Sequence, residues 1–164
     1  MKKGQEFNSK TIYLSFDVED WFQVENLRKL FPPETWEKHQ SRVEENTIRI
    51  LQLLRKWNVK STFFILGWIA ERYPKLVQQI NQDGHEIASH GYGHIINYQL
   101  TREEIFQDIK KSKKILEEIS GKEVIGYRAP NFSVTEDVID ALIDLGFFMI
   151  QVIIHFQLTK DMVN

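Results

Sequence analysis

The chain contains no cysteine, no strong excess of either charge and no long apolar run. Without cysteine there can be no disulfide, no thiolate metal ligand and no cysteine nucleophile. The 21 Lys and Arg residues nearly balance the 23 Asp and Glu residues, and the formal net charge is -2. Because both signs are interspersed, there is neither a basic stripe for nucleic acid nor a polybasic membrane anchor. No segment resembles a secretory signal or a bilayer span, so we expect a cytoplasmic protein with no nucleic-acid or membrane partner.

The overall composition is that of an ordinary globular domain. Hydrophobic residues make up 42% of the 164 residues and charged residues 27%, which is enough for one domain with a buried core. Short apolar runs rich in β-branched and aromatic residues alternate with helical patterns. This alternation is typical of parallel strands joined by crossover helices, and it predicts an α/β protein.

The predicted elements begin after a tail at residues 1–10. Strands are predicted at residues 11–16, 61–66, 86–89, 124–127 and 147–154. Helices are predicted at residues 43–57, around residues 76–80, from a capping box at residues 101–104 to Gly121, and from Thr135 to Gly146.

Polar residues gather where the predicted strands end. Asp17, Glu19 and Asp20 follow the first strand, and the pair His90 and His94 follows the third. Arg128 follows the fourth. Because the loops that leave the carboxyl ends of parallel strands converge, we expect these side chains to be neighbours. Two histidines and one carboxylate match the three-ligand set of a catalytic zinc-like site.

The sequence resembles a known family at four strings that occur in the same order, residues 14–21, 61–67, 84–94 and 127–130. The family is the polysaccharide deacetylases of the NodB-homology type, carbohydrate esterase family 4. The resemblance covers residues 11–148, and it is strongest for the branch that includes peptidoglycan deacetylase-like and exosortase-associated members. It implies a (β/α) barrel and the hydrolysis of the N-acetyl amide of an N-acetylated glycan by a metal-bound water.

The resemblance also implies catalytic roles. Asp17 would be the general base that deprotonates the water, and Arg128 would hold Asp17 in position. The main-chain N–H of Asn131 would help to stabilise the oxyanion.

The implied metal ligands are His90, His94 and a carboxylate. The common family pattern places the carboxylate directly after the base, where this chain has Val18, which cannot bind a metal. Glu19 is favoured over its neighbour Asp20, because residues two apart in a strand face the same side. Zinc is the expected ion, with cobalt, nickel or manganese as alternatives.

Two aromatic residues are further candidates for the site. Trp21 and Tyr92 lie next to the implied metal and base residues in the sequence, and either ring can stack on a sugar face. Aromatic rings near the mouth of a site also serve simply as packing.

The C-terminal segment departs from the family pattern. After Phe148 the family continues Tyr-Asp-Ser-Ser, whereas this chain continues with the residues 149–152, Met-Ile-Gln-Val. Loss of one T from a DNA run that encodes the family string would give the observed string, so residues 149–164 are interpreted as an out-of-frame tail. The chain is then expected to supply five of the seven or eight barrel strands. The family's distal histidine, a general acid, would be absent, and exposed sheet edges would favour self-association.

Three functions are consistent with the sequence. The first is a metal-dependent polysaccharide deacetylase whose activity is impaired by truncation. The second is a metal-free, allantoinase-like amidohydrolase, and the third is a non-catalytic remnant that binds sugar. The two histidines and the acid favour the first.

Overall fold

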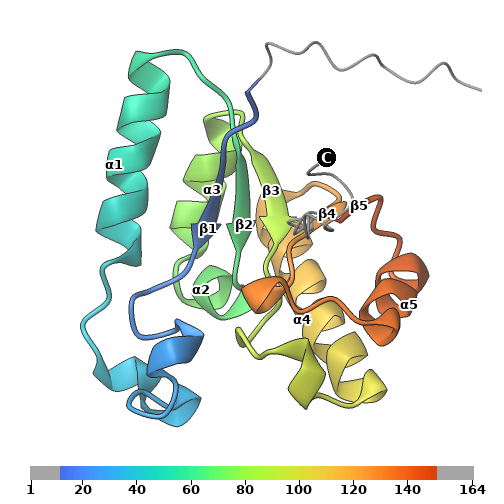
Figure 1. Ribbon diagram of the computed structural model, residues 1–164. Helices are drawn as coiled ribbons and strands as arrows, with labels where there is room; N and C mark the ends of the chain where they lie inside the picture. The colour runs from blue at the N-terminus through green and yellow to red at the C-terminus, as the bar shows by residue number, and fades with distance from the viewer. Residues whose placement is uncertain (1–11, 151–164) are drawn as a thin grey trace, which may run out of the picture.

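The computed structural model describes residues 12–150, which form one parallel sheet with helices packed against it (Figure 1). The five strands are β1 (Ser15–Val18), β2 (Thr62–Ile65), β3 (Glu86–Ser89), β4 (Gly126–Tyr127) and β5 (Met149–Ile150). The α-helices are α1 (Val43–Lys56), α2 (Gly67–Arg72), α3 (Pro74–Gln82), α4 (Arg102–Ser120) and α5 (Glu136–Asp144). Four short 3-10 helices lie in the connections, η1 (Glu25–Leu27), η2 (Pro33–Lys38), η3 (Asn97–Gln99) and η4 (Pro130–Phe132).

The strands lie side by side in the order in which they occur in the chain, β1-β2-β3-β4-β5, and every neighbouring pair is parallel. Sequential order without reversal is the arrangement of a (β/α) barrel, whereas a doubly wound sheet reverses its order. The predicted α/β class and partial barrel are therefore confirmed. Within the described part of the chain, none of the helices combines the length and apolar character needed to cross a membrane.

The core explains why these segments form the sheet. The middle strands are apolar on both faces, with Phe63, Phe64 and Ile65 of β2 each no more than 1% exposed. Such continuous apolar strands are typical of a parallel sheet that helices cover on both sides. Ile105, Ile109 and Leu116 are buried on the inner face of α4, which packs against this core. The other helices contribute further buried side chains to the same core.

Two predicted strands differ in extent from the observed ones. The first is observed at Ser15–Val18 instead of residues 11–16, so Asp17 lies inside β1 rather than after it. The fourth is confined to Gly126–Tyr127, because the backbone of Val124 bonds to side chains of α4. Its N–H donates to Glu117 at 3.0 Å, and its carbonyl accepts from Lys113 at 2.6 Å.

Helix α2 was not predicted, and the predicted C-terminal elements are described only in part. The short helix at Gly67–Arg72 precedes the predicted helix that is observed as α3. Of the predicted fifth strand, Met149 and Ile150 pair with β4. Residues 151–164, which make up most of the proposed out-of-frame tail, and the predicted tail at residues 1–10 lie outside the described residues.

Candidate active site

Strands β1, β3 and β4 bring the predicted site residues to one edge of the sheet. Asp17 in β1 pairs in register with Phe64 of β2, and β2 pairs in turn with β3, after which His90 follows directly. Arg128 follows β4, and its backbone N–H donates to the carbonyl of Ser89 at 2.9 Å. Because all the strands run in the same direction, residues 111 positions apart become direct neighbours.

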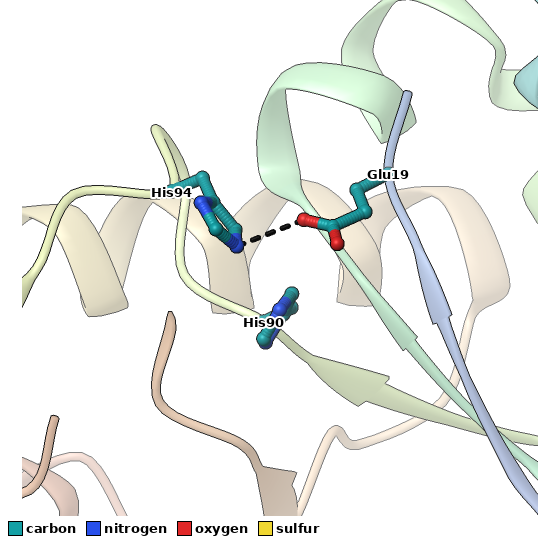
Figure 2. A group of neighbouring side chains, drawn as sticks. All are labelled: Glu19, His90 and His94. Atoms are coloured by element: carbon teal, nitrogen blue, oxygen red, sulfur yellow. Dashed lines mark ion pairs between the residues drawn. The ribbon is translucent and has the colours of Figure 1, made fainter. Parts of the chain in front are cut away.

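Glu19, His90 and His94 form a group of potential metal ligands (Figure 2). One ligand atom from each residue lies within 4.8 Å of the others. His94 Nε2 is 2.8 Å from Glu19 Oε2, and the two imidazole centroids are 5.2 Å apart. Glu19 comes from the loop after β1, and both histidines come from the loop after β3, as Figure 2 shows.

The protonation of His90 leaves one of its nitrogens available to a metal. Its Nδ1 lies 2.8 Å from the backbone carbonyl of Arg128, so Nδ1 carries the hydrogen and Nε2 presents a lone pair to the site. Burial lowers the pKa of His90 from its ordinary value, although the Asp17 carboxylate opposes this shift. The ring is therefore held in the neutral form that a metal requires.

The pKa of Glu19 is also set by its surroundings. Burial alone would raise it, but the interactions of the carboxylate with the adjacent His94 ring, and to a smaller extent with His90, lower it from its ordinary value. Glu19 Oε2 is buried, and its short contact with His94 lacks the alignment of a hydrogen bond. The carboxylate is thus an ionised acceptor next to two imidazoles, without a hydrogen-bond donor for Oε2 among the described residues.

This donor set fits a divalent ion of the zinc type. Two ligands that each lie ~2.1 Å from a tetrahedral ion are separated by ~3.4 Å. The observed ligand atoms, 2.8 Å apart between His94 and Glu19 and all within 4.8 Å, therefore need only small shifts to reach this spacing. One carboxylate and two imidazoles leave a fourth position for a water or a substrate oxygen, as in a catalytic site. The buried, unbonded Glu19 Oε2 agrees with a site that is built to receive a cation.

Asp17 lies beside this group and is oriented by Arg128. Arg128 Nη1 donates to Asp17 Oδ1, and Nη2 donates to Ser15 Oγ at 2.6 Å. The guanidinium carbon stacks 4.1 Å from the ring centre of Phe64. With Oδ1 held in this way, Asp17 Oδ2 faces His90 Nε2 at 3.9 Å. One oxygen of the carboxylate is fixed, and the other is directed toward the ligand group.

A cavity of about 360 Å³ opens in front of these residues. Its lining consists of Asp17, Glu19, Val24, Glu25, Asn26, His90, His94, Ala129, Asn131 and Phe132. Asn131 and Phe132 both have positive φ values, 50° and 54°, in the left-handed region that non-glycine residues seldom occupy. Val24, Glu25, Asn26, Ala129 and Phe132 were not predicted from the sequence, because they lie in connections, in or next to the short 3-10 helices η1 and η4, where no periodicity can be read.

Asp20, predicted as the alternative to Glu19, is placed elsewhere. Its side chain is 2% exposed and accepts from the backbone N–H groups of Trp21, Arg42 and Val43 at 3.0 to 3.3 Å. Arg42 and Val43 begin α1, so Asp20 bonds the free N–H groups at the start of that helix. Of the two candidate carboxylate ligands, only Glu19 joins the ligand group in the described part of the chain, and Asp20 does not.

The two aromatic candidates also lie outside the cavity. Trp21 packs edge-on against Phe31, and its indole N–H donates to the carbonyl of Gln40 at 3.1 Å. The hydroxyl of Tyr92 donates to Glu71 at 2.8 Å, on the side of α2. Neither ring lines the cavity with the ligand group, because each is engaged in packing of its own.

The fold and this site define the class of protein as a partial (β/α) barrel with a metal-type ligand set at the carboxyl edge of its sheet. The model of the polysaccharide deacetylase family matches residues 4–150, and the chain belongs to that family.

Curated relatives and solved structures agree with the family. The chain is 33% identical over 107 residues to a peptidoglycan-N-acetylglucosamine deacetylase of Bacillus cereus, with 65% of this chain and 39% of that protein covered. It is 29% identical over 101 residues to a chitooligosaccharide deacetylase of Azorhizobium caulinodans, with 61% and 48% covered. The chain therefore spans less than half of the length of either relative.

Two solved structures show the same arrangement of strands and helices. A peptidoglycan N-acetylglucosamine deacetylase in complex with 4-naphthalen-1-yl-N-oxidanyl-benzamide superposes with a TM-score of 0.66 at 26% identity, over 85% of this chain and 55% of that one. A pseudoenzyme of carbohydrate esterase family 4 from Bacillus anthracis superposes with a TM-score of 0.69 at 23% identity, over 88% and 43%. At this low identity, the similarity to the pseudoenzyme shows a shared fold and nothing further.

Proposed function

We propose that this chain hydrolyses the N-acetyl amide of an N-acetylated glycan, with a divalent metal held by Glu19, His90 and His94. The observation that carries the proposal is the convergence of these three ligands beside an oriented carboxylate, Asp17, at the mouth of a cavity. The relatives are a peptidoglycan-N-acetylglucosamine deacetylase and a chitooligosaccharide deacetylase, and their substrates suggest the substrate class.

The ligand set favours zinc, and cobalt, nickel or manganese suit the same nitrogen and oxygen donors. When bound, such an ion would act as a Lewis acid on the amide carbonyl and lower the pKa of a water. The hydrogen bond from His90 Nδ1 to the carbonyl of Arg128 keeps the ring oriented for this role.

The remaining groups act on protons and on the developing charge. Asp17 Oδ2 takes a proton from the attacking water while Arg128 holds Oδ1. The main-chain N–H of Asn131, at the cavity wall, donates to the oxygen on which negative charge develops. The proton that Asp17 has taken up is then transferred to the leaving amine.

The test is acetate release from N-acetylglucosamine oligomers by the purified chain, first stripped of metal and then supplied with zinc. We expect release that depends on zinc and that falls by about 100-fold or more in Asp17→Asn, in which the base is lost. The zinc content of Asp17→Asn is expected to equal that of the wild type, because Asp17 is not in the ligand group.

Other outcomes favour the alternatives. Release that persists in the metal-free protein would contradict the proposal and favour a metal-free amidohydrolase. Zinc or sugar binding without any release of acetate would instead indicate a non-catalytic remnant.

A further inference from the structure

The two histidines of the ligand group lie at the ends of a short loop, residues 91–93, whose backbone is bonded from several sides. The carbonyls of Gly91 and Tyr92 accept from the backbone N–H groups of Gly67 and Trp68, at 2.9 and 3.1 Å. These two bonds attach the loop to the start of α2. The loop is therefore held by its main chain, independently of its side chains.

Asp108, on the inner side of α4, bonds the opposite side of this loop. Its Oδ2 accepts from the N–H of Tyr92 at 2.8 Å, and its Oδ1 accepts from the N–H of Gly93 at 3.1 Å. Successive N–H groups that converge on one anion form a concave cradle, and bonds to a charged acceptor are stronger than neutral ones. One carboxylate thus fixes two consecutive peptide units between the histidines.

The sequence of the loop is fitted to this carboxylate. Gly91 has a φ of +76°, and a Cβ at that position would lie 2.8 Å from Asp108 Oδ2. A side chain there would both strain the backbone and displace the carboxylate. Gly91 therefore allows the carboxylate of Asp108 to come close to the backbone of the loop.

Arg28, from the segment that borders the cavity, bonds the far end of the loop. Its Nη2 donates to the carbonyl of His94, and to that of Gly93 at 3.4 Å, while its Nε pairs with Glu25 at 2.6 Å. His94 itself has a φ of +51°, a conformation that persists only when the surroundings impose it. The loop geometry that presents His94 thus depends on contacts from outside the loop.

We infer that Asp108 is a positioning residue that holds the loop between His90 and His94 in the conformation that presents both imidazoles to a divalent ion. The inference rests on the proposed metal site and adds a residue 14 positions beyond His94, on a different element. Asp108 does not line the cavity, so it acts through the loop rather than on the substrate.

The experiment compares Asp108→Ala and Asp108→Asn with the wild type. Glu118→Ala is the matched control, because it also removes a carboxylate from α4. The carboxylate of Glu118 pairs only with the exposed Lys114 among the ion pairs of the described residues, so its loss should have little effect. Binding of cobalt(II) is followed by titration and by its visible absorption spectrum. Amide hydrogen exchange of Tyr92 and Gly93 is measured separately by NMR on the metal-free proteins.

We expect Asp108→Ala to weaken cobalt binding by about 10- to 100-fold, as does the loss of other groups that orient metal ligands. In the metal-free protein the Tyr92 and Gly93 amides should exchange at least ~10-fold faster. Asp108→Asn keeps one acceptor oxygen, so it should restore part of both effects, and Glu118→Ala should change neither.

The two readouts separate this inference from the proposed function. A wild type that binds no cobalt would overturn the metal site, while the exchange rates would still decide whether Asp108 holds the loop. Unchanged exchange of Tyr92 and Gly93 in Asp108→Ala would overturn the inference, even if the wild type binds cobalt. Faster exchange with unchanged cobalt affinity would overturn it too, because the carboxylate would then restrain the loop without presenting the ligands.

Discussion

Arg128 connects the base and the ligand group through different parts of one residue. Its side chain bonds Asp17 and Ser15, while its backbone carbonyl accepts from His90 Nδ1. The family resemblance implied the side-chain contact, and the position of Arg128 at the end of a predicted strand agreed with it. The carbonyl contact could not be predicted, since it depends on the backbone path after β4 and not on the identity of the residue.

A single residue, His85, is predicted to make the stability of the fold depend on pH. It is 5% exposed, and its Nδ1 accepts from the backbone N–H of Ser61 at 3.3 Å. Burial, with a smaller effect of Lys60, lowers its pKa below the ordinary value of 6.5. The folded state then binds fewer protons than the unfolded state, so stability present above about pH 6.5 is lost as the pH falls below it.

We expect the urea midpoint of the wild type to fall between pH 7.5 and pH 5.5, and that of His85→Gln to fall less. The glutamine carbonyl can still accept from Ser61 but does not titrate. His90 contributes in the same direction in both proteins, so the difference between them isolates His85. An equal fall in the two proteins would show that His85 does not carry this dependence.

At the scale of elements, features that depend on neighbouring residues in the sequence were predicted correctly. Features that depend on contacts between distant segments were not. The predicted capping box is present in full at Thr101 and Glu104, and Gly121 ends α4 in the left-handed conformation. Helix α2 has six residues and begins at a glycine, too short for a helical period to be read. The alternation of β1 placed Asp17 and Glu19 on one side, but nothing local revealed that Asp20 would bond to the start of α1, 22 residues away.

The division of roles between adjacent acids is testable. Asp20→Ala is expected to lower the free energy of unfolding by about 2 kcal/mol, because the N–H groups at the start of α1 lose a buried acceptor. Its zinc affinity should change little. Glu19→Ala should show the opposite pattern, with zinc binding lost and the free energy of unfolding nearly unchanged. Urea denaturation and zinc titration of both variants check this. Loss of zinc binding in Asp20→Ala at an unchanged urea midpoint would show that Asp20 is the ligand.

At the scale of the whole molecule, the outer strands of the sheet formed by residues 12–150 are β1 and β5. Residues 12–14, which lead into β1, are apolar and exposed, with Ile12 at 85%. Outer strands with apolar flanks pair readily with other chains unless charge or covering segments prevent it. The alternation of elements predicted a parallel sheet, and the family resemblance predicted its arrangement as a partial barrel. The cavity wall could not be predicted in the same way, because Val24 and Phe132 reach it from the connections between strands and helices.

We expect the chain to self-associate as its concentration rises into the micromolar range. Sedimentation velocity should show growing species in the wild type and a shift toward monomer in Ile12→Lys, since a lysine at an edge opposes pairing. Trp57→Lys, at an exposed position that caps the end of α1 and belongs to none of the strands, serves as the control. A wild type that remains monomeric at every concentration would contradict this expectation.

The central claim, that Glu19, His90 and His94 hold one divalent ion, is tested most directly by X-ray absorption spectroscopy of the zinc-loaded chain with its zinc content measured in parallel. We predict one zinc per chain, with two imidazole nitrogens at about 2.0–2.1 Å and a carboxylate oxygen at a similar distance. Both His94→Ala and Glu19→Ala should lose this signal. Zinc well below one per chain in the wild type, or an unchanged spectrum in the two variants, would contradict the claim.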